Sequence, residues 1–319
     1  MSATSDLMMA RHIAVEISNG KKSCSIRDAR ILAAAFELAD KQRHATSVTQ
    51  LLPLPNADSN AEAISLSRPT TTLDEMVLDG VTRERLERIL LEQRSREILI
   101  AKGLQPSRKV LVYGPPGTGK TMCASMLACA LDLPLMRVET HQLLKQYLGE
   151  TGKNIARVFE RIRATQGVYL FDEFDAIALE RGNAQELGEM KRAVASLLQF
   201  IENDTSESII IAATNHQDLV DRAMFRRFDE VIQFPMPSKE HVESLIRKRL
   251  DGMLSAGIEF SHLRFMSGLG HADVVAACNQ VAKDYVLANR CVSDPITGME
   301  LDSALDERRR AALWSGASS

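Results

Sequence analysis

The sequence predicts an α/β protein: a parallel five-stranded sheet sandwiched by helices, followed by a small all-helical domain. Five short apolar runs alternate with segments of helical periodicity between residues 109 and 234. These runs are almost continuously apolar, as strands covered on both faces are. After Pro235 and Pro237 the apolar runs stop and only helical patterns remain.

The length of 319 residues favours about two domains, and 45% hydrophobic and 25% charged residues are ordinary for a globular protein. A net charge of −3 argues against a nucleic-acid coat or a membrane-surface helix. No apolar run has membrane-spanning length and no signal peptide is evident. We therefore expect a cytoplasmic protein without a nucleic-acid or membrane partner. The five cysteines lack C-x-x-C spacing, so we interpret them as small buried residues.

Four regions are predicted along the chain. Residues 1–51 form an N-terminal helical extension, with one good helix from Ser25 to Ala45. Residues 52–73, rich in proline, asparagine and small polar residues, are typical of a linker. Residues 74–236 form the α/β core, and residues 237–319 form a helical lid with a C-terminal helix.

The stretch "KVLVYGPPGTGKT" predicts a phosphate-binding loop between a strand and a helix. Glycines allow main-chain N–H groups to turn toward phosphates, Lys120 adds a positive charge, and the Thr121 hydroxyl can bind Mg²⁺. A glycine-rich turn without a ligand is the alternative, and the next motif disfavours it. The predicted cofactor-binding residues are Gly114, Pro115, Pro116, Gly117, Thr118, Gly119, Lys120, Thr121 and Met122.

The stretch "VYLFDEFD" places two adjacent carboxylates at the end of a buried strand, where ligands bind in open α/β sheets. Asp172 is the candidate metal ligand with Thr121, and Glu173 is the candidate general base that activates water. We interpret Asp175 as structural.

Two more strands contribute candidates. "SIIIAATN" ends in Asn215, whose amide can bridge attacking water and the γ-phosphate, the alternative being a buried turn asparagine. "MFRRFDEVIQF" carries Arg226 and Arg227 just before a strand. Adjacent residues on an extended chain point to opposite faces, so two arginines with one role are unexpected, and taken alone they are typical of solvated charge.

Together these motifs resemble those of AAA+ ATPases, a class of P-loop NTPases, within the AAA group that bears a second region of homology. Within this group, the motif sequences are similar to those of small bacterial members whose ATPase core is like that of FtsH and SpoVK. "GPPGTGKT" resembles Walker A, "LFDEFDAIA" Walker B, "AATN" sensor 1, and "DRAMFRRFDEVIQFPMP" the segment that ends in paired arginines. The resemblance covers about residues 74–290. It implies hydrolysis of ATP to ADP and phosphate with Mg²⁺, at sites between subunits of a homo-oligomeric ring, usually a hexamer.

The resemblance also implies a role for Arg226 and Arg227 as arginine fingers, which stabilise charge on the γ-phosphate of a neighbouring subunit. Either both arginines reach forward from a turn, or one is the finger and the other braces the interface. "GLGHADV" resembles the lid motif G-x-S-G-A-D, which implies nucleotide contacts by Gly270 and Ala272. Gly270 replaces the usual serine and His271 the usual glycine.

In this family an aromatic–apolar–glycine loop grips polypeptide in the ring pore, and Tyr147, Leu148 and Gly149 match it. Burial of Tyr147 and Leu148 at a helix end is the alternative. Our leading hypothesis is a remodeller or threader of protein substrates. The alternative is a regulatory switch that recruits or gates a separate effector, such as a subtilisin-like serine protease, in some cases in phage defence. A nucleic-acid motor is disfavoured because no basic–aromatic groove is evident.

Overall fold

The structure is a computed structural model in which residues 64–67, 69, 71–140, 151–174, 184–215, 225–255, 257–260, 263, 268–288 and 294–316 are described. The chain divides into two units, Met1–Ser59 and Asn60–Ser319, and all of these residues belong to the second. The predicted helix from Ser25 to Ala45 lies outside the described residues.

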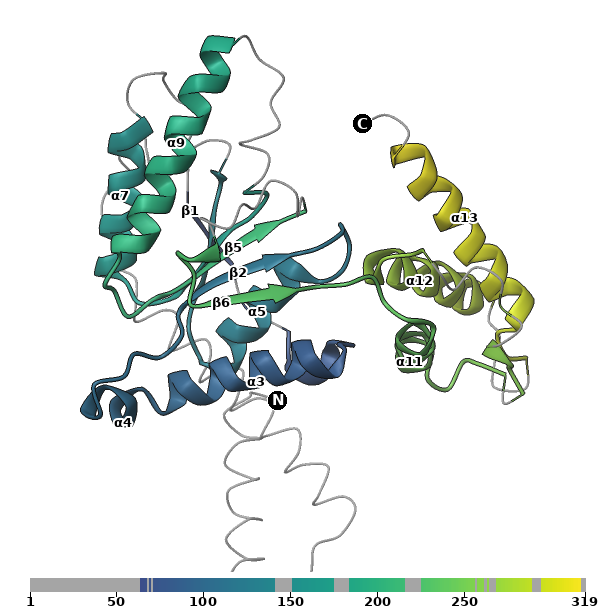
Figure 1. Cartoon of the computed structure of the whole chain (residues 1–319). Coiled ribbons are helices and arrows are strands. Elements are labelled where there is room, and N and C mark those ends of the chain that lie inside the picture. The colour runs from purple at the N-terminus through teal and green to yellow at the C-terminus, as the bar shows by residue number, and fades with distance from the viewer. Residues whose placement is uncertain are drawn as a thin grey trace, which may run out of the picture. The chain divides into compact units, whose positions relative to one another are not determined.

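A six-stranded sheet with the order β1-β3-β4-β5-β2-β6 forms the centre of this unit (Figure 1). Five of its strands are parallel, as the sequence predicted. These are β2 (Lys109–Tyr113), β3 (Leu135–Val138), β4 (Val168–Phe171), β5 (Ile209–Thr214) and β6 (Glu230–Gln233). Every residue of β4 and β5 is buried, which explains why their sequences are continuously apolar.

The sixth strand, β1 (Ile64–Ser67), was not predicted. It pairs antiparallel with β3, with Ile64 opposite Val138. Its four residues lie inside the segment that the sequence predicted to be a linker. The sheet therefore extends one strand beyond the predicted five, at the edge formed by β3.

Helices cover both faces of the sheet (Figure 1). On one face, side chains of α3 (Gly80–Arg94) and α5 (Lys120–Ala130) form a core with apolar residues of β2, β4 and β5. On the other, α7 (Thr151–Ala164) and α9 (Ala184–Asn203) cover the sheet, and Phe159 stacks with Phe171 and Phe200. Two shorter helices, η2 (Leu73–Glu75) and α4 (Arg96–Ala101), flank α3.

The C-terminal helices α11 (Lys239–Arg249), α12 (His271–Leu287) and α13 (Gly298–Gly316) share a separate apolar core. Ser238 caps α11 by accepting a hydrogen bond from the His241 amide at 3.3 Å. Cys278 is buried in this core and Cys123 in the sheet core, as expected, and burial raises their pKa to about 11 and about 12. None of the helices described is both long and apolar enough to cross a membrane.

The direction of the strands determines where polar residues gather. Because β2, β4 and β5 are parallel neighbours, the residues that follow Tyr113, Phe171 and Thr214 emerge at one edge of the sheet. In open α/β folds this carboxyl edge is where ligands bind.

Candidate active site

The loop between β2 and α5 contains the predicted phosphate-binding residues. Gly114 follows β2 with φ +147°, and a Cβ atom built there would lie 2.1 Å from the main-chain oxygen of Phe234. Only glycine therefore fits between β2 and the end of β6. The Thr118 hydroxyl donates a hydrogen bond to the Pro115 carbonyl at 2.8 Å, which closes the loop on itself.

Lys120 is the first residue of α5, and only 7% of it is exposed. Its Nζ donates hydrogen bonds of 2.8 Å to the carbonyl oxygens of Gly114 and Pro115. The ammonium group thus lies within the loop, beside the N-terminal end of α5. Both its charge and the helix N-terminus favour an anion at this point.

The predicted metal ligands lie together. The Thr121 hydroxyl donates to Asp172 Oδ2 at 2.8 Å, although 51 residues separate the two in sequence. Asp172 Oδ1 accepts from the Glu173 amide at 3.0 Å, and the Asp172 carbonyl accepts from the Thr140 hydroxyl at 2.9 Å. The carboxylate is therefore fixed between the loop and the end of β4, with oxygen donors of the kind that Mg²⁺ prefers.

Glu173 has φ +50°, a left-handed conformation that is uncommon for a residue with a side chain. The neighbouring amide of Phe174 donates to the Ala213 carbonyl of β5 at 2.9 Å, so β5 holds the turn in which Glu173 lies. Strained residues of this kind occur at functional sites, where the surrounding structure maintains them.

Asn215 follows β5, which lies between β4 and β2. Thr214, the last residue of β5, pairs with Tyr113 and accepts a hydrogen bond from the Gly114 amide at 3.3 Å. Asn215 therefore comes directly after the strand that separates the carboxylate turn from the phosphate loop. This is the position that the sequence predicted for it.

Arg226 and Arg227 lie far from the phosphate loop of their own chain. They precede β6, whose first residue, Glu230, is opposite Val110 near the start of β2. The phosphate loop follows the other end of β2, about 15 Å away along the strand. Arg226 is exposed, whereas Arg227 is half-buried and forms an ion pair with Glu202 at 3.4 Å between Nε and Oε2. The phosphate loop therefore lies at the carboxyl ends of the strands, and the arginines lie at the opposite, amino ends.

The predicted lid residues contact the phosphate loop. The Ala272 amide, in the first turn of α12, donates to the Gly117 carbonyl at 3.0 Å. A Cβ atom at Gly270 would lie 3.1 Å from the carbonyl oxygens of both Gly117 and Pro116. The absence of a side chain at Gly270, where the family pattern has serine, allows this close approach.

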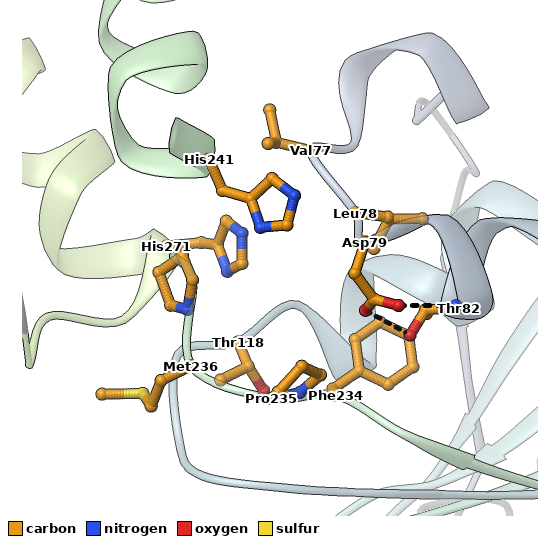
Figure 2. Close-up of a pocket in the computed structure, with 11 residues that line it drawn as sticks. Val77, Leu78, Asp79, Thr82, Thr118, Phe234, Pro235, Met236, His241 and His271 are labelled. Atoms are coloured by element: carbon orange, nitrogen blue, oxygen red, sulfur yellow. Dashed lines mark hydrogen bonds between the residues drawn. The ribbon is translucent and has the colours of Figure 1, made fainter. Parts of the chain in front are cut away.

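A pocket beside the loop was not predicted (Figure 2). Its lining comes from the segment before α3, the loop, the end of β6 and the first turns of α11 and α12, and includes Val77, Asp79, Thr118, His241 and His271. Two of these residues had a signal in the sequence: Thr118 belongs to the predicted phosphate loop, and His271 departs from the lid motif. Val77, Asp79 and His241 belong to no motif, and long stretches of chain separate His241 from the other two.

The pKa values of His271 and Asp79, which both line the pocket, are shifted by their surroundings. Burial and then the nearby His241 lower the pKa of His271, and both of its ring nitrogens are buried. At Asp79, burial acts to raise the pKa, but hydrogen bonds from the Thr82 hydroxyl at 2.6 Å and amide at 2.9 Å lower it overall. Neutral imidazole and ionised carboxylate are thus the favoured forms near neutral pH.

Some predicted residues lie outside the described residues or at the margin of the site. Tyr147, Leu148 and Gly149 belong to the first group, as does Asp175. Met122 is half-buried and packs against the core that α5 shares with the sheet.

Comparison with known proteins agrees with this geometry. Residues 110–236 match the model of the ATPase family associated with various cellular activities (AAA). An uncharacterised AAA family ATPase of Sinorhizobium fredii, y4kL, is 34% identical over 286 residues, which cover 89% of this chain and 86% of that protein. The chain belongs to the AAA family of ATPases.

Two further relatives of this AAA ATPase have more specific names. A proteasome-activating nucleotidase of Methanothermobacter thermautotrophicus is 30% identical over 239 residues, which cover 72% of this chain and 58% of that protein. The ATP-dependent zinc metalloprotease FtsH 3 of Sphaerobacter thermophilus is 29% identical over 249 residues, covering 76% and 50%. The chain thus spans between half and three fifths of the length of these two relatives.

Membership identifies the chemistry of the site. The AAA ATPase binds ATP and hydrolyses it to ADP and phosphate, and the loop from Gly114 to Thr121, which resembles a Walker A motif, lies within the residues that match the family. Asp172 and Glu173 directly follow β4, the strand whose sequence resembles a Walker B motif. The predictions of family, α/β P-loop fold and ATPase activity are therefore confirmed.

Proposed function

We propose that this AAA ATPase assembles into a homo-oligomeric ring, with six subunits as in the family it resembles, and hydrolyses ATP at the interfaces between subunits. One observation carries the proposal: Arg226 and Arg227 lie at the amino ends of the strands, whereas the Walker A loop of the same chain lies at their carboxyl ends. With about 15 Å of strand between them, neither side chain can serve the nucleotide of its own chain. A neighbouring subunit's nucleotide is the partner that this position favours.

Within each site we assign roles by contact. Thr121 and Asp172 would hold Mg²⁺, and their 2.8 Å hydrogen bond supports this because it brings two oxygen donors together beside the loop. The ion would offset charge on the phosphates. Lys120 binds the phosphates, Glu173 orients and deprotonates water, and Asn215 positions water against the γ-phosphate. The arginine from the neighbour stabilises the charge that develops on the γ-phosphate oxygens.

The base and lid have proposed roles as well. The pocket that includes Val77 and His271 adjoins the loop through Thr118, but its cavity of about 10 Å³ has room for about one water, so a base bound there would have to part the lid from the core. Gly270 and Ala272 contact the loop directly. We infer that bound nucleotide joins core and lid.

The work done by hydrolysis is proposed to be remodelling of a protein substrate. Two relatives support a protein as the substrate: one is named a proteasome-activating nucleotidase and the other an ATP-dependent zinc metalloprotease. Tyr147, Leu148 and Gly149 are the proposed grip, from the pore-loop pattern in the sequence. The alternative of a regulatory switch has no support in the names of these relatives and stays a prediction.

Mixing two inactive chains tests the shared site. An Arg226→Ala/Arg227→Ala chain keeps its own Walker A loop, and a Lys120→Ala chain keeps its arginines. Together they form some complete interfaces, so ATP turnover should reappear in the mixture. If no ATP turnover reappears at any mixing ratio, catalysis in trans is refuted. Light scattering of Glu173→Gln with ATP tests assembly, and a strictly monomeric species would contradict the ring.

The protein-remodelling role requires a separate assay. Unfolding of a fluorescent protein fused to an unstructured tail should depend on Tyr147, while ATP turnover without substrate should not. A Tyr147→Phe control keeps the aromatic ring and should retain unfolding. Unchanged unfolding by Tyr147→Ala would reject the proposed grip.

A further inference from the structure

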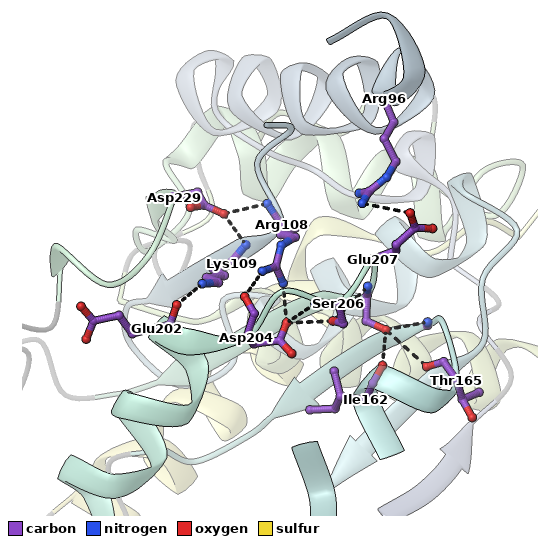
Figure 3. Close-up of polar contacts among 12 residues, drawn as sticks. Arg96, Arg108, Lys109, Ile162, Thr165, Glu202, Asp204, Ser206, Glu207 and Asp229 are labelled. Carbon is purple, nitrogen blue, oxygen red and sulfur yellow. Dashed lines mark hydrogen bonds and ion pairs between the residues drawn. The ribbon is translucent and has the colours of Figure 1, made fainter. Parts of the chain in front are cut away.

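Hydrogen bonds and an ion pair join the C-terminal end of α9 to the start of β2 (Figure 3). This is the amino end of the strand, and the Walker A loop follows its carboxyl end. Lys109 Nζ donates to the main-chain oxygen of Glu202 at 2.6 Å. The Arg108 guanidinium forms a 2.5 Å ion pair with Asp204, whose side chain is fully buried. These contacts fix the main chain of the last turn of α9 and do not use the Glu202 carboxylate.

The turn that carries the arginines is fastened to the same place. One carboxylate oxygen of Asp229 accepts hydrogen bonds from the amides of Arg108 and Lys109 at 3.0 and 2.9 Å. The Asp229 amide donates to the Lys109 carbonyl at 2.8 Å. Asp229 thus fixes the main chain two residues after Arg227, and only the arginine side chains remain to be oriented.

The Glu202 carboxylate orients one of them. It pairs with Arg227 Nε at 3.4 Å, and the Arg227 side chain is 30% exposed. Arg226, its neighbour, is exposed. The two arginines therefore differ in environment: one is held within its own chain by α9, and the other faces outward.

We propose that Glu202 is a positioning residue for hydrolysis at the neighbouring site. By retaining Arg227, it makes Arg227 the brace of the turn and leaves Arg226 as the finger that reaches the neighbour's nucleotide. This inference rests on the proposed catalysis in trans. It resolves the adjacency of the arginines, since two neighbouring residues in different environments, one paired with Glu202 and one exposed, have two roles.

The ion pair contributes to position more than to folding. More than half of the Glu202 side chain is exposed, at 56%, and exposed pairs of this kind contribute little to stability. The main-chain anchors at Lys109 and Asp229 remain when the carboxylate is lost. Its removal should therefore leave the fold intact and allow the arginine side chains to move.

The test uses the full chain with Glu202→Gln, which keeps the shape of the side chain and removes its charge. Glu207→Gln is the matched control, because Glu207 pairs with Arg96 at 3.3 Å, is 63% exposed and lies at the same edge of the sheet (Figure 3). For Glu202→Gln we expect kcat to fall about twofold to fivefold, because an exposed pair can bias the position of Arg227 by no more than that. KM for ATP and Tm should match those of the control.

Mixing separates positioning from general damage. A Glu202→Gln chain mixed with a Lys120→Ala chain should regain turnover, because the second chain offers a correctly held Arg226 to the intact Walker A loop of the first. A kcat equal to that of Glu207→Gln, or a loss that mixing does not restore, would overturn the inference. An Arg226→Ala chain mixed with Lys120→Ala tests the proposed function separately. If that mixture recovers while Glu202→Gln is normal, only the role of Glu202 is refuted.

Discussion

The Thr121 hydroxyl donates a hydrogen bond to the Asp172 carboxylate at 2.8 Å and so joins the first turn of α5 to the end of β4. The contact brings together the two oxygen atoms that we propose as Mg²⁺ ligands, of which only the carboxylate oxygen can carry charge. We expect Asp172→Asn, which has one acceptor oxygen in place of two, to accept one of the carboxylate's two hydrogen bonds and to lower kcat at least about a hundredfold, because the amide binds Mg²⁺ weakly. Binding of ADP in the presence of EDTA should change little.

Isothermal titration calorimetry with and without Mg²⁺ checks this prediction. Asp306→Asn is a suitable control, because Asp306 pairs with Arg310 within α13 and belongs to no part of the proposed site. Equal loss of ADP affinity in Asp172→Asn with and without Mg²⁺ would show that Asp172 supports the loop rather than the metal.

Gly114→Ala should prevent the Walker A loop from forming. The added Cβ would lie 2.1 Å from the Phe234 carbonyl oxygen, at a φ of +147° that side chains rarely adopt. We expect a loss of more than about 3 kcal/mol in the free energy of unfolding, or no folded protein. Gly80→Ala is the control, since no atom lies within 4 Å of its added Cβ and φ is not positive. Thermal unfolding compares the two, and equal Tm values would contradict the argument.

The sequence predicted the parts of the fold that rest on continuous apolar runs. Strands such as β4 and β5 are buried along their whole length, so their composition alone indicates them. Their parallel order then predicts that Lys120, Asp172 and Asn215 meet at one edge. Strand β1 escaped prediction although "ISLS" alternates apolar and polar residues as a half-buried strand does, because it has only four residues and lies in a proline-rich segment. Its pairing with β3, about 70 residues later, and the packing of Ile64 against the core stabilise it.

Contacts between side chains that are distant in the sequence could not be predicted from it either. Glu202 at a helix end is typical of a solvated charge, and its pairing with Arg227 depends on where α9 ends relative to β6. The pocket with His241 and Asp79 depends on the approach of lid and core. Such positions follow from tertiary packing and carry no local pattern.

Asp204 should be important for stability although it has no proposed role in hydrolysis. Its fully buried carboxylate pairs with Arg108 at 2.5 Å and also accepts a hydrogen bond from the Ser206 hydroxyl at 2.8 Å. Asp204→Ala leaves the guanidinium, 13% exposed, without its charge partner, which should cost about 3–5 kcal/mol. Glu92→Ala is a contrasting control at a pair with an exposed arginine.

Urea unfolding of both variants checks the prediction. The change for Glu92→Ala should be smaller than that for Asp204→Ala, although Glu92 also accepts hydrogen bonds from Ser107. Similar losses in the two variants would show that burial does not strengthen the Arg108–Asp204 pair.

His271 should make stability depend on pH below neutrality. Burial lowers its pKa in the folded chain, so the unfolded chain, with a pKa near 6.5, binds more protons between the two values. Stability is therefore fully present above about pH 6.5 and is lost progressively as the pH falls toward the folded value. His271→Gln removes this titration, so its Tm should fall less than that of the wild type between pH 7.5 and 5.5. Parallel Tm curves for the two proteins would show that the histidine stays neutral, or charged, in both states across this range.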